Sequence, residues 1–184
     1  MAARLTRLGV LVTLTAGLIL TVSACASVDR PTVQADQVPL PTPLRSFDTS
    51  VADTLTALEA AVASTGERLE TPVGAYRPSE PQDLLQTPRV VRRAALADAD
   101  DGYVIVYEAG SRGAALEQAQ ALADYLESGF GQTNYVADSQ FSVSTLEDTV
   151  IFATWSRRAS GDAARAEAVF DAIATVGTPL TIDK

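Results

Sequence analysis

Few side chains of this sequence could act as acids, bases or nucleophiles. There is no histidine, and the only lysine is the terminal residue, Lys184. The serines therefore lack the usual base that activates a hydroxyl group for attack. The clearest paired carboxylates are Asp124 and Asp171, but two carboxylates hydrolyse a glycosidic bond only at a set separation inside a cleft. No feature of the sequence predicts a cleft, so we expect no enzymatic activity; a carboxylate-based hydrolase is the alternative.

An acidic cluster precedes a glycine at Asp98, Asp100, Asp101 and Gly102. Such a cluster could bind calcium, but an EF-hand loop needs ligands at positions 1, 3 and 5, glycine at 6 and glutamate at 12. Counted from Asp98, the glycine falls at position 5. Since Asp-Gly is common in hairpin turns, we predict a turn here and no bound metal or other cofactor.

A short glycine-containing stretch, Gly110-Ser111-Arg112-Gly113, lies between a predicted strand and a predicted helix. Backbone N–H groups at such a place can hold an anion, but the stretch lacks the glycine-rich span and the lysine of a P-loop. We predict that it only starts the helix. The chain has a net charge of −9, which repels phosphate backbones and disfavours a nucleic-acid partner.

The only cysteine of the chain, Cys25, follows an apolar segment near the start of the sequence. The chain begins with Arg4 and Arg7, continues with an apolar run over residues 8–21, and reaches Cys25 through small residues. This order is typical of a secretory signal. The run is shorter than the about twenty residues of a bilayer span, although an uncleaved anchor, or an ordinary thiol after an ordinary signal, is the alternative.

The tetrapeptide Val22-Ser23-Ala24-Cys25 resembles the lipobox of bacterial lipoproteins. The resemblance implies cleavage before Cys25, a thioether-linked diacylglyceryl group on its sulfur, and usually a further acyl chain such as palmitate on its amino group. Two or three acyl chains hold a protein stably on a membrane. Membrane lipid is thus the first expected partner, and the expected location is the extracytoplasmic side of the cell membrane. The rest of the chain resembles uncharacterised bacterial lipoproteins, which implies no activity.

The chain divides into four predicted segments. Residues 1–24 are the signal peptide, and residues 25–45 are the lipidated cysteine with a disordered, proline-rich tether. Residues 46–88 hold a helix and a proline-rich loop, and residues 89–184 form one domain. The helix is predicted over 46–70 from apolar residues at helical spacing, and these are Phe47, Val51, Leu55, Leu58, Val62 and Leu69.

The domain reads as two similar units, related by a shift of 47 residues, each with two strands and a helix. We predict strands at 90–97, 103–107, 140–146 and 149–156, with helices at 113–128 and 160–177. This ββαββα order resembles a circular permutation of the ferredoxin-like fold. The resemblance implies an α+β two-layer sandwich whose four-stranded antiparallel sheet has the spatial order first, second, fourth, third. Both helices would cover one face, and the N-terminal helix the other.

The turn at Glu147-Asp148 sets the register of the second hairpin, so that Val143 faces Phe152. The same topology brings Arg112 close to Glu147. The sheet face away from the two helices would carry apolar side chains that need a cover, and these are Val91, Val104, Val106, Ile151, Ala153 and Trp155. The cover is predicted to be the N-terminal helix; another protein chain is the alternative.

Three functions are compatible with these patterns. The leading hypothesis is a membrane-anchored envelope lipoprotein with a non-catalytic binding or adaptor domain and a possible envelope protein partner. Its candidate binding residues are Val104, Val106, Ile151 and Trp155. The alternatives are a small-ligand or lipid carrier, with a pocket between the sheet and the N-terminal helix, and the carboxylate-based hydrolase.

Overall fold

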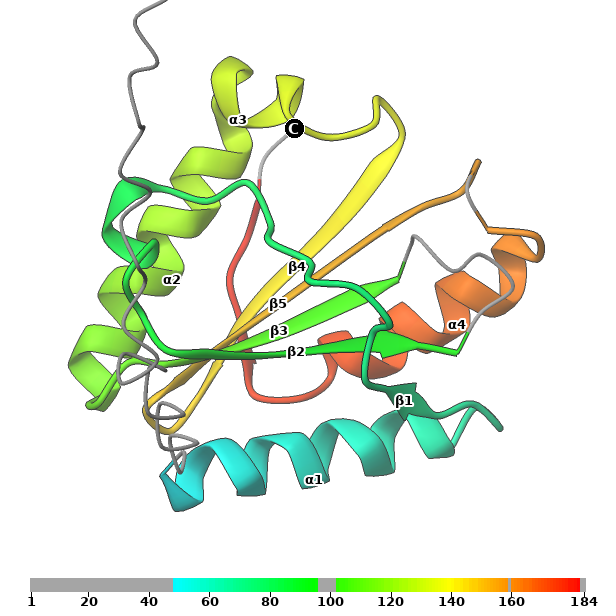
Figure 1. Ribbon diagram of the computed structural model, residues 1–184, viewed down its shortest axis with the longest axis horizontal. Coiled ribbons are helices and arrows are strands. Elements are labelled where there is room, and N and C mark those ends of the chain that lie inside the picture. Colours follow the sequence, from blue (N-terminus) through cyan, green and yellow to red (C-terminus); the bar gives the residue numbers. More distant parts are fainter. Residues whose placement is uncertain (1–47, 96–101, 159, 183–184) are drawn as a thin grey trace, which may run out of the picture. The chain divides into compact units, whose positions relative to one another are not determined.

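The computed structural model describes residues 48–95, 102–158 and 160–182, which belong to one compact unit (Figure 1). The signal peptide, Cys25, the tether and the Asp98–Asp100–Asp101 turn lie outside the described residues. The unit is α+β, with four α-helices and an open, antiparallel, six-stranded sheet. The helices are α1 (Thr49–Ala63), α2 (Arg112–Glu127), α3 (Gly129–Thr133) and α4 (Ala163–Ala174), and a 3₁₀ turn, η2, spans Gln82–Leu84.

The sheet has the order β1-β2-β3-β5-β4-β6. Its strands are β1 (Leu69–Glu70), β2 (Arg89–Ala94), β3 (Tyr103–Glu108), β4 (Ser139–Leu146), β5 (Thr149–Ser156) and β6 (Thr178–Pro179). The four central strands lie in the predicted order, but the prediction of a four-stranded sheet is wrong. Two short edge strands add to it, and each follows a glycine with positive φ: Gly66, at +85°, and Gly177, at +81°.

The N-terminal helix, predicted over 46–70, is shorter than expected, because the chain turns at Gly66. Asp48 caps its start by accepting a bond from the Thr49 N–H. The helix ends at Ala63, and the chain turns through Gly66. Leu69, predicted to continue the helical stripe, instead pairs with Ala94 in the sheet.

The second hairpin has the predicted register. Val143 faces Phe152 across β4 and β5, and Glu147 adopts a positive φ of 53° in the two-residue turn. The predicted neighbourhood of Arg112 is also confirmed, since its Nη2 lies 2.5 Å from Glu147 Oε2.

The first hairpin does not repeat the register of the second. Its connection runs from β2 to β3 through residues 95–102, so Val91 pairs with Ile105 and Val90 pairs with Val106. An odd shift in register moves every side chain of a strand to the other face. Val91 is therefore on the opposite face from the one predicted, and Val90 takes its place beside Val106.

The two long helices of the domain lie on opposite faces of the sheet, which contradicts the predicted single helical layer. Residues of α2 pack with Ile105, Tyr107 and Phe152, whereas residues of α4 join Val106 and Ile151. The fold is therefore not the permuted ferredoxin-like sandwich that the strand order implied.

The direction of the last crossover explains this difference. The β3–α2–β4 connection steps over β5, and the β5–α4–β6 connection steps over β4 in the same direction. The strands that begin the two connections, β3 and β5, are antiparallel. The two crossovers therefore have the same handedness only if α2 and α4 lie on opposite faces of the sheet. Connections between parallel strands are almost always right-handed, so pairing of β6 with β4 places α4 on the face opposite α2.

The sheet face that carries Val104, Val106 and Ile151, which was predicted to need a cover, is covered by α1 and α4. Val51, Leu58 and Val62 of α1 are fully buried in one core with α4 and the sheet. A buried hydrogen bond of 2.9 Å between the hydroxyl groups of Thr54 and Thr149 joins α1 to β5. The prediction that the N-terminal helix packs on this face is confirmed, and Figure 1 shows α1 running along the sheet on the side away from α2.

The second core lies between the other face, α2 and the loop formed by residues 71–88. Leu84 of η2 is completely buried there, beside residues of α2 and β3. Each face of the sheet is thus covered by a different set of elements, and both cores are closed by side chains of this chain.

Candidate functional site

A sharp corner at the end of α2 forms part of the wall of a cleft on the surface of the described domain. Ser128 ends α2 and starts α3: its backbone N–H donates to the carbonyl oxygens of Asp124 and Tyr125, and its Oγ accepts a 3.0 Å bond from the Gly131 N–H. A Cβ atom at Gly131 would lie 1.9 Å from the Tyr125 carbonyl oxygen. Only glycine fits this close approach, so the corner is fixed by the residue types at 128 and 131.

The corner directs two apolar side chains into solvent. Phe130 is 73% exposed and Val136, just after α3, is 60% exposed. Most large apolar side chains of the domain are buried, and Val73 and Leu116 are also exposed elsewhere, but Phe130 and Val136 belong to one short segment beside α3 and are candidates for contact with a partner. Tyr135, between them, instead points inward and packs edge-to-face on Phe141 at 4.8 Å.

A cleft of about 380 Å³ lies beside α3. It is lined by Gly129, Gln132, Thr133, Tyr135, Val136, Ala137, Ser139 and Phe141. None of these residues is charged, although the protein as a whole has a net charge of −9. Aromatic rings with a few amide and hydroxyl groups are typical of surfaces that bind uncharged or apolar groups.

Asp138 interrupts the residues that line this cleft in the sequence, but its carboxylate bonds to residues at the end of β5. Asp138 accepts a 2.8 Å bond from the Ser156 hydroxyl and another, also 2.8 Å, from the backbone N–H of Arg158. The bond from Ser156, followed by that from Arg158, lowers the pKa of Asp138. The carboxylate is therefore ionised and held at the end of β5, which leaves the cleft uncharged.

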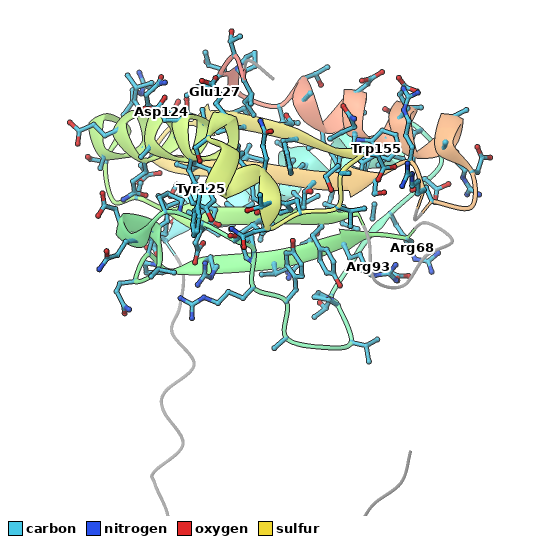
Figure 2. The ribbon with its side chains drawn as sticks, turned by 90° about the horizontal axis from the view of Figure 1, so that it is seen from above. Arg68, Arg93, Asp124, Tyr125, Glu127 and Trp155 are labelled. Carbon is cyan, nitrogen blue, oxygen red and sulfur yellow. The ribbon has the colours of Figure 1, made fainter. Side chains whose placement is uncertain are left out.

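Tyrosine hydroxyl groups tie the 71–88 loop to the same corner. The Tyr135 hydroxyl donates to the Ser79 carbonyl oxygen at 2.6 Å, and the Ser79 hydroxyl lies 2.5 Å from that of Tyr125. Burial raises the pKa of Tyr135 above its ordinary value, so its phenol remains a donor. Figure 2 shows Tyr125 on the side of α2 that faces this loop, whereas Asp124 points outward from the same helix.

A buried carboxylate anchors the next residue of the loop. The side chain of Glu80 is completely buried, accepts a 2.7 Å bond from the Tyr107 hydroxyl, and pairs with the Arg89 guanidinium. Burial, and then the bond to Glu80, raise the pKa of Tyr107. Nothing in the local sequence indicates this network, because its members come from a loop and two strands.

The four predicted binding residues lie inside the protein. Val104, Val106 and Ile151 are at most 1% exposed and Trp155 is 5% exposed, all beneath α1 and α4. Trp155 stacks on Phe170 of α4 at 5.6 Å. Val104, Val106 and Ile151 are therefore closed off in a core, and Trp155 reaches the surface only at a small cleft of about 170 Å³ that Phe170 and Asp171 also line. The interface between α1 and the sheet, where the carrier hypothesis placed its pocket, is filled by the same core.

The predicted carboxylate pair is not brought together. Asp124 and Asp171 are both exposed, on helices that cover opposite faces of the sheet. Among the described residues, no group of three or more histidine, cysteine or acidic side chains could hold a metal ion. Ser111 caps α2 by accepting a bond from the Ala114 N–H, as expected for the start of a helix.

Comparison with known proteins found no matching family, no matching curated protein and no matching solved structure. None of the helices within residues 48–95, 102–158 and 160–182 is long and apolar enough to cross a membrane. Conclusions about function therefore depend on the residues themselves. Of the surfaces described, the cleft beside α3 combines exposed apolar side chains with a shaped, uncharged wall.

Proposed function

We propose that this protein is a lipid-anchored lipoprotein of the bacterial cell envelope, whose folded domain binds a partner protein and has no catalytic role. The anchor is proposed from the residues before and at Cys25, whose spacing resembles a lipobox. The binding role is carried by one observation, the uncharged cleft beside α3, which has the exposed Val136 in its wall and the exposed Phe130 on the same short helix. An apolar side chain of the partner would enter the cleft and be shielded from water there.

Two features support binding over catalysis. The sequence has no histidine, and the two carboxylates that the repeat pairs are exposed and on opposite faces of the sheet. The cleft is lined by side chains that neither donate nor accept protons readily at neutral pH. Such a wall recognises shape and apolar surface rather than activating a substrate.

The anchor is tested by replacing the thiol. In cells fed an alkyne fatty acid, Cys25→Ala should lose the label and leave the membrane fraction, whereas Ala26→Ser should keep both. A Cys25→Ala protein that still carries the label would refute acylation at this residue. A protein that loses the label yet stays in the membrane would support the uncleaved anchor instead.

The cleft is tested by photo-crosslinking in intact cells. A benzophenone amino acid at Val136 should give a discrete protein adduct. The same group at Leu116, which is 57% exposed on α2, should not give that adduct. Phe130→Asp should abolish the adduct from Val136 without changing the amount of protein. An identical adduct from Leu116, or no protein adduct from Val136, would contradict the proposal. A lipid adduct in its place would support the carrier function.

A further inference from the structure

One margin of the sheet is only partly closed. Strand β1 pairs with the last two residues of β2, Arg93 and Ala94. Within the part of the chain that the structure describes, no strand pairs with the outer side of residues 89–92. An uncovered edge of this kind can accept a further strand.

The hydrogen-bond ladder shows which backbone groups of β2 face outward. The Ala94 N–H donates to the Gly102 carbonyl oxygen at 2.8 Å, and the Glu108 N–H donates to the Pro88 carbonyl oxygen at 2.9 Å. Bonding to one neighbour alternates along an antiparallel strand. The even-numbered residues of β2 therefore bond to β3, and the N–H and carbonyl groups of the odd-numbered residues, including Val91, point away from it.

Two residues thus offer outward backbone groups next to each other along the edge, Arg89 and Val91. A strand added there would gain main-chain hydrogen bonds from both, with the Val91 carbonyl oxygen, which already accepts from the Arg92 side chain, using its second lone pair; extended peptides join exposed sheet edges in this way. Val91 is partly buried against the core on the α2 side, so an apolar side chain of the added strand would pack beside it.

The charges along this edge favour an acidic occupant. Arg92 lies on the other side of β2, toward α1; it donates to the Val91 carbonyl oxygen at 3.1 Å and forms no ion pair with a carboxylate of the described residues. Glu70 pairs with both Arg68 and Arg93, whose side chains lie together in Figure 2. Among the described residues of this edge, arginines thus outnumber carboxylates, although the protein as a whole has a net charge of −9.

The same charges disfavour a second copy of this chain. Pairing β2 with β2 of another molecule would place arginines of the two strands next to each other, and like charges across strands are destabilising. We propose that the outer edge of β2 binds an extended acidic segment of a partner protein by strand addition, with carboxylates on the Arg92 side and apolar side chains beside Val91. This proposal is independent of the cleft beside α3.

The test uses the full chain in detergent micelles and a fluorescein-labelled peptide, Thr-Glu-Val-Glu-Val-Glu-Val-Thr. Fluorescence anisotropy should show saturable binding that weakens as salt is added. A peptide with glutamine at each glutamate position should bind more weakly. A peptide N-methylated at alternate residues keeps every charge but loses the donors of the ladder, so it should not bind.

Variants of β2 test the edge from the protein side. Val91→Pro removes an outward N–H that β3 does not use, and proline is tolerated at such a position of an edge strand; binding should be lost. Val91→Ala removes more side-chain atoms than Val91→Pro does, but it keeps the backbone N–H. Its Kd should therefore stay within about twofold of the unchanged protein, since the loss of one partly buried contact changes little. Arg92→Gln should raise the Kd by about two- to fivefold, as for a single exposed ion pair.

Several results would overturn the proposal. These are no binding of the acidic peptide, equal binding of the N-methylated peptide, or unchanged binding to Val91→Pro when the emission of Trp155 shows a folded protein. A salt-stabilised dimer that Val91→Pro dissociates would assign the edge to a second copy. If Val91→Pro does not fold, the N-methylated peptide still decides the question. If Phe130→Asp abolishes the Val136 adduct but still binds the acidic peptide, the edge of β2 and the cleft beside α3 are two independent binding surfaces.

Discussion

The packing of α1 on the sheet can be tested by removing one buried side chain. Leu58 lies in the middle of α1, is completely buried, and belongs to the core that α1 shares with β3, β5 and α4. Leu58→Ala removes apolar contacts and leaves a cavity, which costs about 2–5 kcal/mol in a well-packed core. For a domain of this size, each 1 kcal/mol corresponds to about 3–5 °C in the melting temperature. A central value of ~3 kcal/mol thus predicts a fall of ~9–15 °C.

The assay can use the only tryptophan of the chain, Trp155. It is 5% exposed and stacks on Phe170 within the same core, so its emission should shift to longer wavelength when this core opens. Thermal unfolding of the full chain in detergent, followed by tryptophan emission, gives the melting temperature of each variant.

Leu116→Ala is the matched control. It makes the same change in a helix interior, and with it the same change in helix propensity, but Leu116 is 57% exposed on α2. Its effect should remain within about 0.5 kcal/mol, as for most surface substitutions. If Leu58→Ala lowered the melting temperature no more than Leu116→Ala, α1 would not be packed on the sheet, and the argument from burial would fail.

Four further perturbations follow from the structure. Raising the pH should lower the free energy of unfolding, because burial raises the pKa of Tyr107 and Tyr135. The unfolded chain releases these protons above pH ~10 while the folded state keeps them, so stability should be unaffected at lower pH and then fall by up to ~1.4 kcal/mol per pH unit for each tyrosine. Urea titrations at several pH values should show this fall in the free energy of unfolding. The fall per pH unit should be smaller for Tyr107→Phe. Gly177→Ala should cost at least ~1–2 kcal/mol in thermal unfolding, because the residue has a φ of +81° and a Cβ atom would lie 2.4 Å from a carbonyl oxygen of β4. In contrast, Gly113→Ala has open space and should stabilise α2 by ~0.5–1 kcal/mol. Glu80→Gln should cost about 3 kcal/mol in the same measurement, the lower end for a buried pair, since its arginine partner is 17% exposed. An unchanged melting temperature for Glu80→Gln would mean that the buried network does not hold the 71–88 loop.

Local patterns predicted the four central strands and helices α1, α2 and α4, and the resemblance to a permuted ferredoxin-like fold implied the order of those strands. The second hairpin is set by a two-residue turn, so its register and the pairing of Val143 with Phe152 follow from counting residues. The contact of Arg112 with Glu147 follows in turn from the strand order. Helical spacing similarly identified the buried face of α1, although not the point at which α1 ends.

The candidate site could be predicted only in part. Helical spacing and Gly129 indicate where α2 stops, and the end of the helix at Glu127 agrees with this. The exposure of Phe130 and the inward direction of Tyr135 depend on the close approach of Gly131 to the Tyr125 carbonyl oxygen. That approach comes from the packing of α3 on α2, which no local pattern encodes.

The sequence by itself thus determined the four central strands, the presence of α1, α2 and α4, and which side chains of the second hairpin share a face, whereas β1, β6 and α3 were not predicted. The tertiary structure alone decided on which face each helix lies. The handedness of the last crossover depends on which strand β6 pairs with. Because β6 consists only of Thr178–Pro179, it is too short to leave a recognisable pattern in the sequence. Its pairing with β4 places α4 opposite α2. Val104, Val106, Ile151 and Trp155 are therefore enclosed in a core, because a side chain's burial is decided by elements that are distant along the chain.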